Sequence, residues 1–446
     1  MRHVIVNIFR SKAPLMVVLR YVLLALVILM GVARLRLILV LLVSPATYQE
    51  RDILQEYLMA KALLSGVNPY LPLQELAQLF IGKFPYLPHP APYPPFIAIL
   101  SIPLTWLSLN NLIIGWFIFE VGCLAAIAGM LTFLWKGRVD WIQAIFILFL
   151  LLSWYPVMVD LLYGQLTILL ATLLLAALLA LRKNHKILAG VIIGFSVAIK
   201  MFTWPLIIYF AVKKDWKALF SSILTTLGLN LVALIVLGFT PIMDYYLHVS
   251  MQVSAIYHGF LKNYSIWSIG YRLFEGSGLT EKDFISAPPL VDLPSAAPWV
   301  SAALAAAFLV VGLIWAIRSK EVDIAYSILI CVLVAISPIA WDHYYLMILI
   351  CLAVLLLNLS RHSFPTWPTI IFIIIAFMLF FFNDQIAEVI FIFNGGKDLL
   401  QTRGNQITFA SGMLEILPIV ELIILAILLW RRGITSPLAK TAEELV

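Results

Sequence analysis

Stretches of about 20 consecutive apolar residues recur along almost the whole chain, and this feature constrains the fold more than any other. Such a stretch has the length that a helix needs to cross a hydrocarbon core of about 30 Å. Of the 446 residues, 63% are hydrophobic and only 12% are charged, well below the charged share of a typical soluble domain. The apolar stretches do not alternate with polar residues as the strands of a membrane β-barrel do. The sequence therefore predicts an all-α, polytopic helical membrane protein.

We expect about twelve membrane-spanning helices in one integral domain, residues 1–446. The first span follows a basic segment and no small-residue cleavage pattern comes after it, which predicts an uncleaved first helix. The predicted spans are 13–42, 93–108, 111–134, 142–160, 165–182, 187–212, 217–239, 297–317, 322–337, 344–358, 366–383 and 411–430.

Three longer polar segments separate these spans: residues 44–92, 240–296 and 384–409. Within the first of them, residues 50–64 carry apolar side chains at helical spacing, which predicts an amphipathic helix on the membrane surface. The first segment ends in the proline-rich stretch 85–95, which cannot be helical.

Basic residues indicate the orientation of the second half, because they mark cytoplasmic turns. They are Arg318, Lys320, Arg361, Arg431 and Arg432. We therefore expect residues 431–446 to form a cytoplasmic tail, and the segments 44–92 and 240–296 to lie outside the cytoplasm. The net charge of +6 reflects such loops rather than nucleic-acid binding.

The same rule leaves two alternatives open in the first half of the chain. Twelve full spans place the basic turns 136–138 and 182–186 on the outside, against the rule. The other alternative folds residues 187–212 into a re-entrant hairpin, and it requires a different number of crossings between residues 93 and 134.

Asp52 is an acid placed soon after the first predicted span. One interpretation is that it caps the helix that follows, since Asp is a favoured N-cap residue. The other is that it acts as a general base at the membrane boundary, where a hydroxyl nucleophile needs a carboxylate to accept its proton. The position of Asp52 alone leaves both interpretations open.

Lys200 lies deep in a predicted span, where a charge is costly and needs an anionic partner. In one interpretation Lys200 extends to the membrane boundary or pairs with an internal acid. In the other it pairs with a phosphate group near a helix break at Pro205. Arg272, in the second large polar segment, could hold a phosphate through bidentate hydrogen bonds.

Polar residues also interrupt apolar stretches at 160–165 and 337–345. In the second of these, an aromatic belt at the membrane surface accounts for Trp341 and Tyr344 but not for His343. The three cysteines, Cys123, Cys331 and Cys351, lie in apolar stretches and are predicted to fill the core. The acids are too scattered for a metal site, and no glycine-rich nucleotide loop is present.

Taken in order, these short motifs resemble glycosyltransferase family 87, the polyprenyl-phosphate-mannose-dependent mannosyltransferases of the GT-C superfamily. The resemblance covers residues 45–360. The matching residues are Asp52, Gly66-Val67-Asn68-Pro69-Tyr70, Tyr93-Pro94-Pro95, Gly164-Gln165, Lys200 with Pro205, Asn263-Tyr264-Ser265 with Arg272, and Ser337-Pro338 with Trp341, His343 and Tyr344. The chain departs from the family pattern at Ile53, where an aromatic residue is usual, and in a slightly longer spacing from Lys200 to Pro205.

The resemblance implies a GT-C fold in the cell inner (plasma) membrane, with an extracytoplasmic active site and no cofactor. It implies that a sugar, expected to be mannose, passes with inversion from a polyprenyl-phosphate donor to a hydroxyl of a glycolipid or glycan. The implied general base is Asp52, and His343 orients or assists at the donor phosphate. Lys200 and Arg272 are candidates for neutralising that phosphate. The substrate-binding candidates are Tyr93, Gln165, Asn263, Ser265, Trp341 and Tyr344.

Two alternatives remain beside this function. A transporter or lipid-linked glycan flippase would also place polar residues inside the membrane, and Lys200 favours it. However, no internal repeat is visible, and most polar motifs are expected on one face of the membrane. The other alternative is a different GT-C enzyme, which acts with another sugar or on protein.

Overall fold

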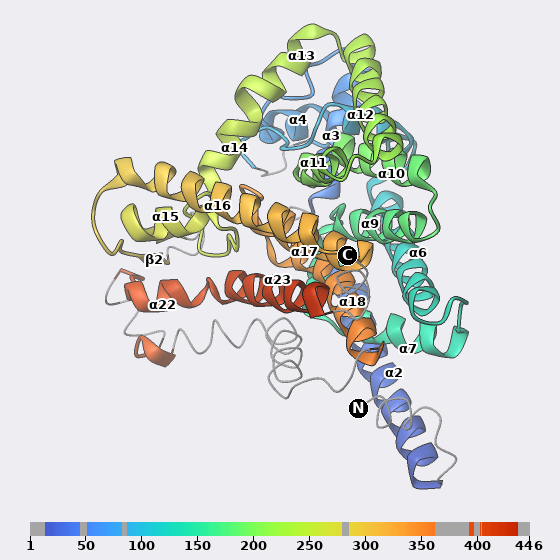
Figure 1. Ribbon diagram of the computed structural model, residues 1–446. Helices are drawn as coiled ribbons and strands as arrows, with labels where there is room; N and C mark the ends of the chain where they lie inside the picture. Colours follow the sequence, from blue (N-terminus) through green and yellow to red (C-terminus); the bar gives the residue numbers. More distant parts are fainter. Residues whose placement is uncertain are drawn as a thin grey trace. The chain divides into compact units, whose positions relative to one another are not determined.

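The computed structural model describes residues 14–44, 51–82, 87–278, 285–361, 392–396, 402 and 404–435. Almost all regular structure in this part of the chain is helical, and Figure 1 labels its elements. The chain divides into two compact units. The N-terminal unit comprises Leu24–Ser153 and Val157–Ala255, and the C-terminal unit comprises the described parts of Ile256–Val446, Trp154–Pro156 and Met1–Leu23.

The N-terminal unit is built from helices of very different lengths, drawn in blue to green in Figure 1. Helix α10 packs against both α9 and α12, and α6 packs against α7 and α9. The elements are α2 (Pro14–Leu42, of which the larger part belongs here), α3 (Ile53–Leu64), α4 (Leu73–Phe80), α5 (Phe96–Leu100), η2 (Ile102–Trp106), α6 (Leu109–Lys136), α7 (Trp141–Leu152), α8 (Tyr155–Tyr163), α9 (Thr167–Arg182), α10 (Lys186–Ile199), η3 (Met201–Thr203), α11 (Pro205–Val212), α12 (Trp216–Leu237), α13 (Phe239–Asp244), the π-helix η4 (Tyr245–Val249) and α14 (Ser250–Tyr257).

In the C-terminal unit, α17 is the central helix and contacts α16, α18 and α23. Thirteen of its fifteen residues are buried, which explains why this segment is apolar on all sides. The elements are α15 (Trp267–Phe274), β1 (Ser277–Gly278), β2 (Ser286–Ala287), η5 (Pro294–Ala296), α16 (Ala297–Arg318), α17 (Val322–Ile336), η6 (Asp342–Met347), α18 (Ile348–Arg361), α22 (Phe409–Leu414) and α23 (Leu417–Thr435). The two short strands pair antiparallel, with Ser277 opposite Ala287.

Several long helices confirm that the protein is an all-α, multi-pass membrane protein. Five described stretches are long and apolar enough to cross a membrane, and α7 with α8, bent by 73°, would make a sixth as one broken span. The five are Tyr21–Leu42, Leu109–Lys136, Trp216–Leu237, Pro294–Arg318 and Phe409–Gly433. The expected number of about twelve spans and the GT-C architecture stay predictions.

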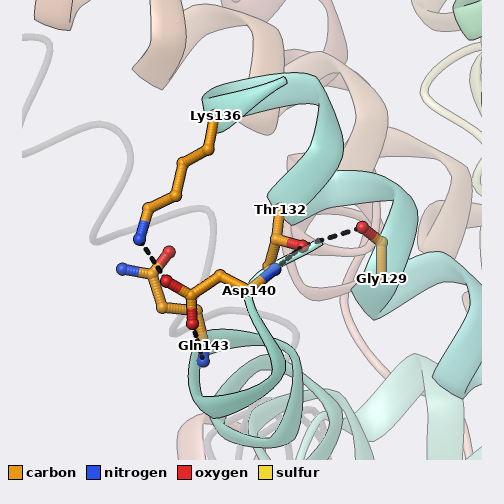
Figure 2. Close-up of polar contacts among 5 residues, drawn as sticks. All are labelled: Gly129, Thr132, Lys136, Asp140 and Gln143. Carbon is orange, nitrogen blue, oxygen red and sulfur yellow. Dashed lines mark hydrogen bonds and ion pairs between the residues drawn. The ribbon is translucent and has the colours of Figure 1, made fainter. Parts of the chain in front are cut away.

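The turn between α6 and α7 shows how the sequence sets helix ends (Figure 2). Helix α6 ends at Gly137, whose φ of 71° is the left-handed conformation that glycine adopts readily. Asp140 then caps α7 by accepting from the backbone N–H of Gln143 at 3.1 Å, and it pairs with Lys136 at 2.5 Å. The hydrogen bond from Lys136 holds the pKa of Asp140 below its usual value. This basic turn is therefore fixed by local bonds.

The predicted span 93–108 is wrong as a single helix. The structure forms two helices of five residues there, α5 and η2, each only about 7.5–10 Å long. Ser101 separates the two helices, and Pro103 lies near the start of the second, where proline is tolerated. Neither helix is long enough to cross a bilayer.

The predicted amphipathic helix at 50–64 is also placed differently from the expectation. Helix α3 begins at Ile53, and nine of its twelve residues are buried, including the polar Gln55 and Glu56. It packs against α4, α5 and η2 inside the N-terminal unit. The polar face, which an amphipathic helix on a membrane surface would turn toward water, is thus enclosed by protein.

The remaining predictions can be placed briefly. Cys123, Cys331 and Cys351 are free and buried, which confirms their predicted place in the core. The predicted span 366–383 lies outside the described residues, as do most of the segment 384–409 and residues 436–446 of the predicted cytoplasmic tail.

Candidate active site

Asp52 lies at the N-terminus of α3, where the chain is bonded to the end of α8. Its backbone N–H donates to the carbonyl oxygen of Tyr163 at 2.8 Å. The neighbouring Arg51 is buried, and its guanidinium donates to the carbonyl oxygens of Leu162 and, at 3.0 Å, of Leu41. These bonds fix the start of α3 against two other helices of the same unit.

The carboxylate of Asp52 does not cap its own helix. Asp52 occupies the N-cap position, but its side chain makes no capping hydrogen bond. Its Oδ1 accepts from Nε2 of Gln55 at 2.6 Å, and its Oδ2 accepts from Nε2 of Gln165. The side chain is only half-buried. The structure therefore removes helix capping as the explanation for Asp52, and it leaves a partly exposed carboxylate held by two neutral amides.

Gln165 reaches Asp52 because of the turn at Gly164, where α8 ends. The N–H groups of Gly164 and Gln165 both donate to the carbonyl oxygen of Asp160, at 2.8 and 3.2 Å. Gly164 has a φ of +66°, and a Cβ atom there would lie 3.0 Å from the side chain of Ile53. Both the backbone angle and the close approach of Ile53 require glycine at this position.

Tyr93 extends the hydrogen-bond chain from the proline-rich segment. Its hydroxyl donates to Oε1 of Gln165 at 3.4 Å, while its own carbonyl oxygen accepts from the hydroxyl of Tyr70 at 2.9 Å. Tyr70 closes the Gly-Val-Asn-Pro-Tyr motif, and its N–H donates to the side chain of Asn68 at 3.0 Å. Two motifs from the first polar segment thus support Gln165, which in turn holds Asp52.

Lys200 stands at a break between two helices. It ends α10 with an extended backbone (φ −155°, ψ 107°), and the chain resumes as η3 and then α11. The predicted helix break next to Pro205 is present: α10 ends before Lys200, and Pro205 begins α11, where proline is well tolerated. The Lys200 ammonium lies 5.8 Å from the centre of the Tyr93 ring, within cation–π range.

The electrostatics of Asp52 follow from these neighbours. Burial raises the pKa of Asp52 to about 6, against the lowering effects of the Gln55 bond, the Lys200 charge and the Gln165 bond. The group is therefore ionised at neutral pH and more basic than an ordinary aspartate. A carboxylate of that basicity suits proton abstraction near pH 7.

Glu56 belongs to this site but is not among the site residues predicted from the sequence. It lies four residues after Asp52 on α3, a spacing that puts both side chains on one helix face. Its side chain is buried, with 1% exposed, and burial raises its pKa well above the ordinary value. The i, i+4 spacing of two acids was the available signal.

Asn263 and Ser265 hold together two segments of the C-terminal unit. The Asn263 amide donates to the carbonyl oxygens of Tyr257 and Pro338 at 3.0 and 3.1 Å. Its Oδ1 accepts from the N–H groups of Ala340 and Ser265 at 3.0 and 3.2 Å. These contacts are structural, and the predicted role of the two residues in substrate binding stays a prediction.

Arg272 is likewise surrounded by protein. Its guanidinium donates to the carbonyl oxygens of Gly412 and Leu261, both at 2.6 Å, and to Asn263 at 3.3 Å. Only 2% of the residue is exposed, and burial lowers its pKa to about 10, which leaves it charged at neutral pH. Its contacts are those of a residue that binds loop carbonyls, and its predicted contact with a phosphate stays a prediction.

The Ser-Pro motif leads into the aromatic part of the C-terminal unit. Trp341 is half-buried, and the rings of Tyr257 and Phe260 meet it edge-on, each with its centre 5.3 Å from that of Trp341. His343 and Tyr344 are buried in η6, with ring centres 5.0 Å apart.

The predicted site residues thus fall into two groups. Asp52, Tyr93, Gln165 and Lys200 form one connected cluster in the N-terminal unit. The C-terminal unit holds the others: Asn263, Ser265, Arg272, Trp341, His343 and Tyr344. That both groups serve one substrate stays a prediction. In the part of the chain that the structure describes, no three His, Cys, Asp or Glu side chains come together as a metal ion would need.

Comparison with known proteins gives one match. The model of a family described as glycosyltransferase family 87 matches residues 92–338, which is more than half of the chain. The match includes Tyr93, Gln165, Lys200 and Arg272, while Asp52 precedes it and His343 follows it. No curated protein and no solved structure matches the chain significantly.

Proposed function

The chain belongs to glycosyltransferase family 87, and we propose that within this family it transfers mannose from a polyprenyl-phosphate donor to a hydroxyl of a glycolipid or glycan. We propose that the transfer occurs on the extracytoplasmic side of the cell inner membrane and inverts the anomeric centre. A donor carried on a lipid is consistent with a catalyst embedded in the membrane. The acceptor hydroxyl attacks the sugar, its proton passes to Asp52, and the polyprenyl phosphate leaves.

The observation that carries this proposal is the state of the Asp52 carboxylate. Gln55 and Gln165 hold it by hydrogen bonds from amides that do not titrate, so they orient the group without competing for the proton. The side chain keeps a partly exposed surface at which a hydroxyl can approach. Its pKa of about 6 lies close to neutral pH, which favours general base catalysis there.

Lys200 supplies positive charge beside this base. It acts electrostatically on both Asp52 and Glu56, and a cation at that place would also stabilise the charge that develops on a departing phosphate. The roles of His343 and Arg272 at the donor phosphate rest on the family resemblance alone.

The test is transfer of radiolabelled mannose from polyprenyl-phosphate-mannose to membrane lipids, comparing the wild type with Asp52→Asn. We expect the substitution to lower the rate at least about 100-fold, because a missing general base typically costs that much. Asp140→Asn is the matched control, since Asp140 caps α7 and has no part in the cluster. Equal transfer by wild type and Asp52→Asn would remove Asp52 from the chemistry.

The interrupted helices are the observation that favours a flippase as the second function. Breaks inside membrane-spanning segments often line ion or substrate paths in transporters, and this chain has one at Lys200 and another between α7 and α8. A vesicle assay separates the two functions. Movement of a fluorescent polyprenyl-phosphate sugar between leaflets, without any sugar transfer, would favour the flippase.

A further inference from the structure

Glu56 is a buried acid beside the proposed base, yet neither of its carboxyl oxygens has a hydrogen bond within 3.5 Å from the described residues. Native proteins satisfy most buried polar groups, so an unsatisfied pair of oxygens on one side chain requires an explanation. A bound ligand is one such explanation, because a carboxyl group prepared for a substrate lacks its partner until the substrate arrives.

The polar groups near Glu56 belong to the cluster around Asp52 rather than to the apolar core. Asp52 lies one helical turn earlier on the same face of α3. The charges of Asp52 and Lys200 act on the Glu56 carboxyl, and the Tyr93 hydroxyl acts on it as a long or poorly aligned hydrogen-bond donor. All three of these residues belong to the connected cluster of the N-terminal unit. Glu56 therefore lies beside the same cluster as the base.

We propose that Glu56 binds a hydroxyl group of the sugar substrate next to Asp52. Asp52 takes the proton of the attacking hydroxyl, and Glu56 orients a second hydroxyl by one hydrogen bond. This inference rests on the proposed function, and it deepens it by naming a binding residue of the same site. The hydroxyl can belong to the donor sugar or to the acceptor, and the two sources give different results in the experiment below.

The protonation state of Glu56 decides which substitution is informative. Burial and the neighbouring Asp52 charge raise its pKa well above the ordinary value, which favours the protonated, neutral carboxyl. A neutral carboxyl donates one hydrogen bond and accepts another, as an amide does. Glu56→Gln should therefore keep binding within about threefold, whereas Glu56→Leu removes the bond and should weaken it by about 10- to 100-fold.

The experiment uses the full chain in lipid nanodiscs and measures two quantities. The first is the dissociation constant of polyprenyl-phosphate-mannose, compared with that of bare polyprenyl phosphate. The second is the apparent KM for a membrane lipid extract as the acceptor. If Glu56→Leu binds polyprenyl-phosphate-mannose more weakly but binds bare polyprenyl phosphate as the wild type does, the hydroxyl belongs to the donor. Unchanged donor binding with a raised KM for the extract assigns it to the acceptor.

Glu421→Leu is the matched control. Glu421 is also buried, and its oxygens also lack hydrogen bonds from the described residues, but it lies on α23 of the C-terminal unit. We expect this variant to leave both measured quantities unchanged. A folded Glu56→Leu protein in which neither quantity changes overturns the proposal and makes Glu56 a buried acid without a ligand.

Two further measurements cover the cases in which Glu56→Leu does not fold or the proposed function fails. If Glu56→Leu does not fold, deoxy analogues of the mannose donor and of the accepted lipid are measured on the wild type and on Glu56→Met, which keeps the length of the side chain without its polar atoms. One analogue should weaken wild-type binding about 10-fold or more but should not weaken binding to Glu56→Met. Equal factors for every analogue would overturn the proposal.

Failure of the proposed function has a separate signature, in which the wild type neither transfers mannose nor prefers the mannosylated carrier. In that case, polyprenyl-phosphate carriers of other hexoses replace polyprenyl-phosphate-mannose in the binding measurement. If the wild type prefers a carrier with another hexose, a weaker preference in Glu56→Leu supports the proposal, and Glu56→Met is measured instead where Glu56→Leu does not fold. Absence of any sugar preference overturns it.

Discussion

Gln165 donates a hydrogen bond to the carboxylate of Asp52 across 113 residues of sequence. Gln55 donates to the other oxygen of the same carboxylate from the next turn of α3, at 2.6 Å. Both donors are neutral amides, so the ionisation of Asp52 responds to their presence without a second titrating group in direct contact. The ionisation of Asp52, the proposed base, can therefore be followed through its effect on the rate of transfer.

The rate of sugar transfer should fall as the pH is lowered through about 6. The carboxylate is the active form of a general base, and burial raises the pKa of Asp52 to about 6. Activity should therefore be full above about pH 7, half at about pH 6, and lost below about pH 5. A pH–rate profile at saturating substrate checks this. A profile that stays flat down to pH 4.5 would contradict it.

Gln165→Leu should move this acid limb to higher pH. The hydrogen bond from Gln165 lowers the pKa of Asp52, so its loss raises that pKa further and leaves less of the base ionised at pH 7. We expect the rate at pH 7 to fall about 3- to 10-fold and to recover in part at pH 8.5. Gln143→Leu serves as control, since Gln143 lies on α7 and only its backbone N–H bonds to an acid.

Asp52→Asn should stabilise the folded protein while it abolishes transfer. The pKa of Asp52 is raised from 3.8 to about 6 on folding, so ionised Asp52 disfavours the folded state above pH 6. Removing the charge should add about 1–3 kcal/mol of stability at pH 8, after allowing for partial exposure of the group. The advantage should disappear as the pH falls from 6 toward 4. Thermal unfolding in detergent at both pH values measures it, and a lower Tm at pH 8 would count against the buried position of Asp52.

Gly164→Ala should impair transfer more than Gly66→Ala does. Both glycines have positive φ angles, of +66° and +69°, so both substitutions carry a backbone cost of about 1 kcal/mol. Only at Gly164 does the added Cβ also meet Ile53, whereas nothing lies within 4 Å at Gly66. The extra displacement moves Gln165 away from Asp52, and we expect at least a 10-fold lower rate. Equal rates for the two variants would mean that the turn does not position Gln165.

Arg272→Met and Lys200→Met should fail in different ways. Loss of Arg272 leaves several buried carbonyl oxygens without donors, which should lower the folded yield and cost several kcal/mol of stability. Loss of Lys200 should leave folding intact, because its charge acts across the cluster on Asp52 and Glu56. Size-exclusion profiles and transfer rates of the two variants, side by side, separate the outcomes. A well-folded Arg272→Met protein with weakened donor binding would restore Arg272 to the phosphate.

Long apolar helices are predictable from sequence because length and composition alone decide them. The predicted spans 111–134, 217–239 and 297–317 agree within two residues at each end with α6, α12 and α16. Interruptions are harder to predict, since a hydropathy average hides them. The segment 93–108 is predicted as one span, yet it becomes two short helices. For the segment 187–212 the sequence leaves both a full span and a re-entrant hairpin open, and the helix breaks at Lys200.

The site shows the same division. Asp52 could be named as a candidate base from its place and its motif, but its partner Gln165 could not be identified from the sequence alone, because a contact across 113 residues depends on the tertiary fold. The spacing of Glu56 from Asp52 could have identified it as a candidate. However, a second acid is ordinary on a helix that is expected at a membrane surface. Only the burial of α3 makes Glu56 unusual.

The Asn263 amide has a consequence for how this protein is produced. Residues 263–265 read Asn-Tyr-Ser, the acceptor pattern for N-linked glycans in the secretory pathway of eukaryotic hosts. Asn263 is fully buried, and both of its amide donors and its oxygen are bonded to the chain. A glycan attached there during synthesis would prevent those bonds and therefore the native packing of the C-terminal unit. For expression in such a host, Ser265→Ala removes the pattern and leaves the Asn263 side chain in place, at the loss of the hydrogen bond from the Ser265 hydroxyl to the carbonyl oxygen of Pro338.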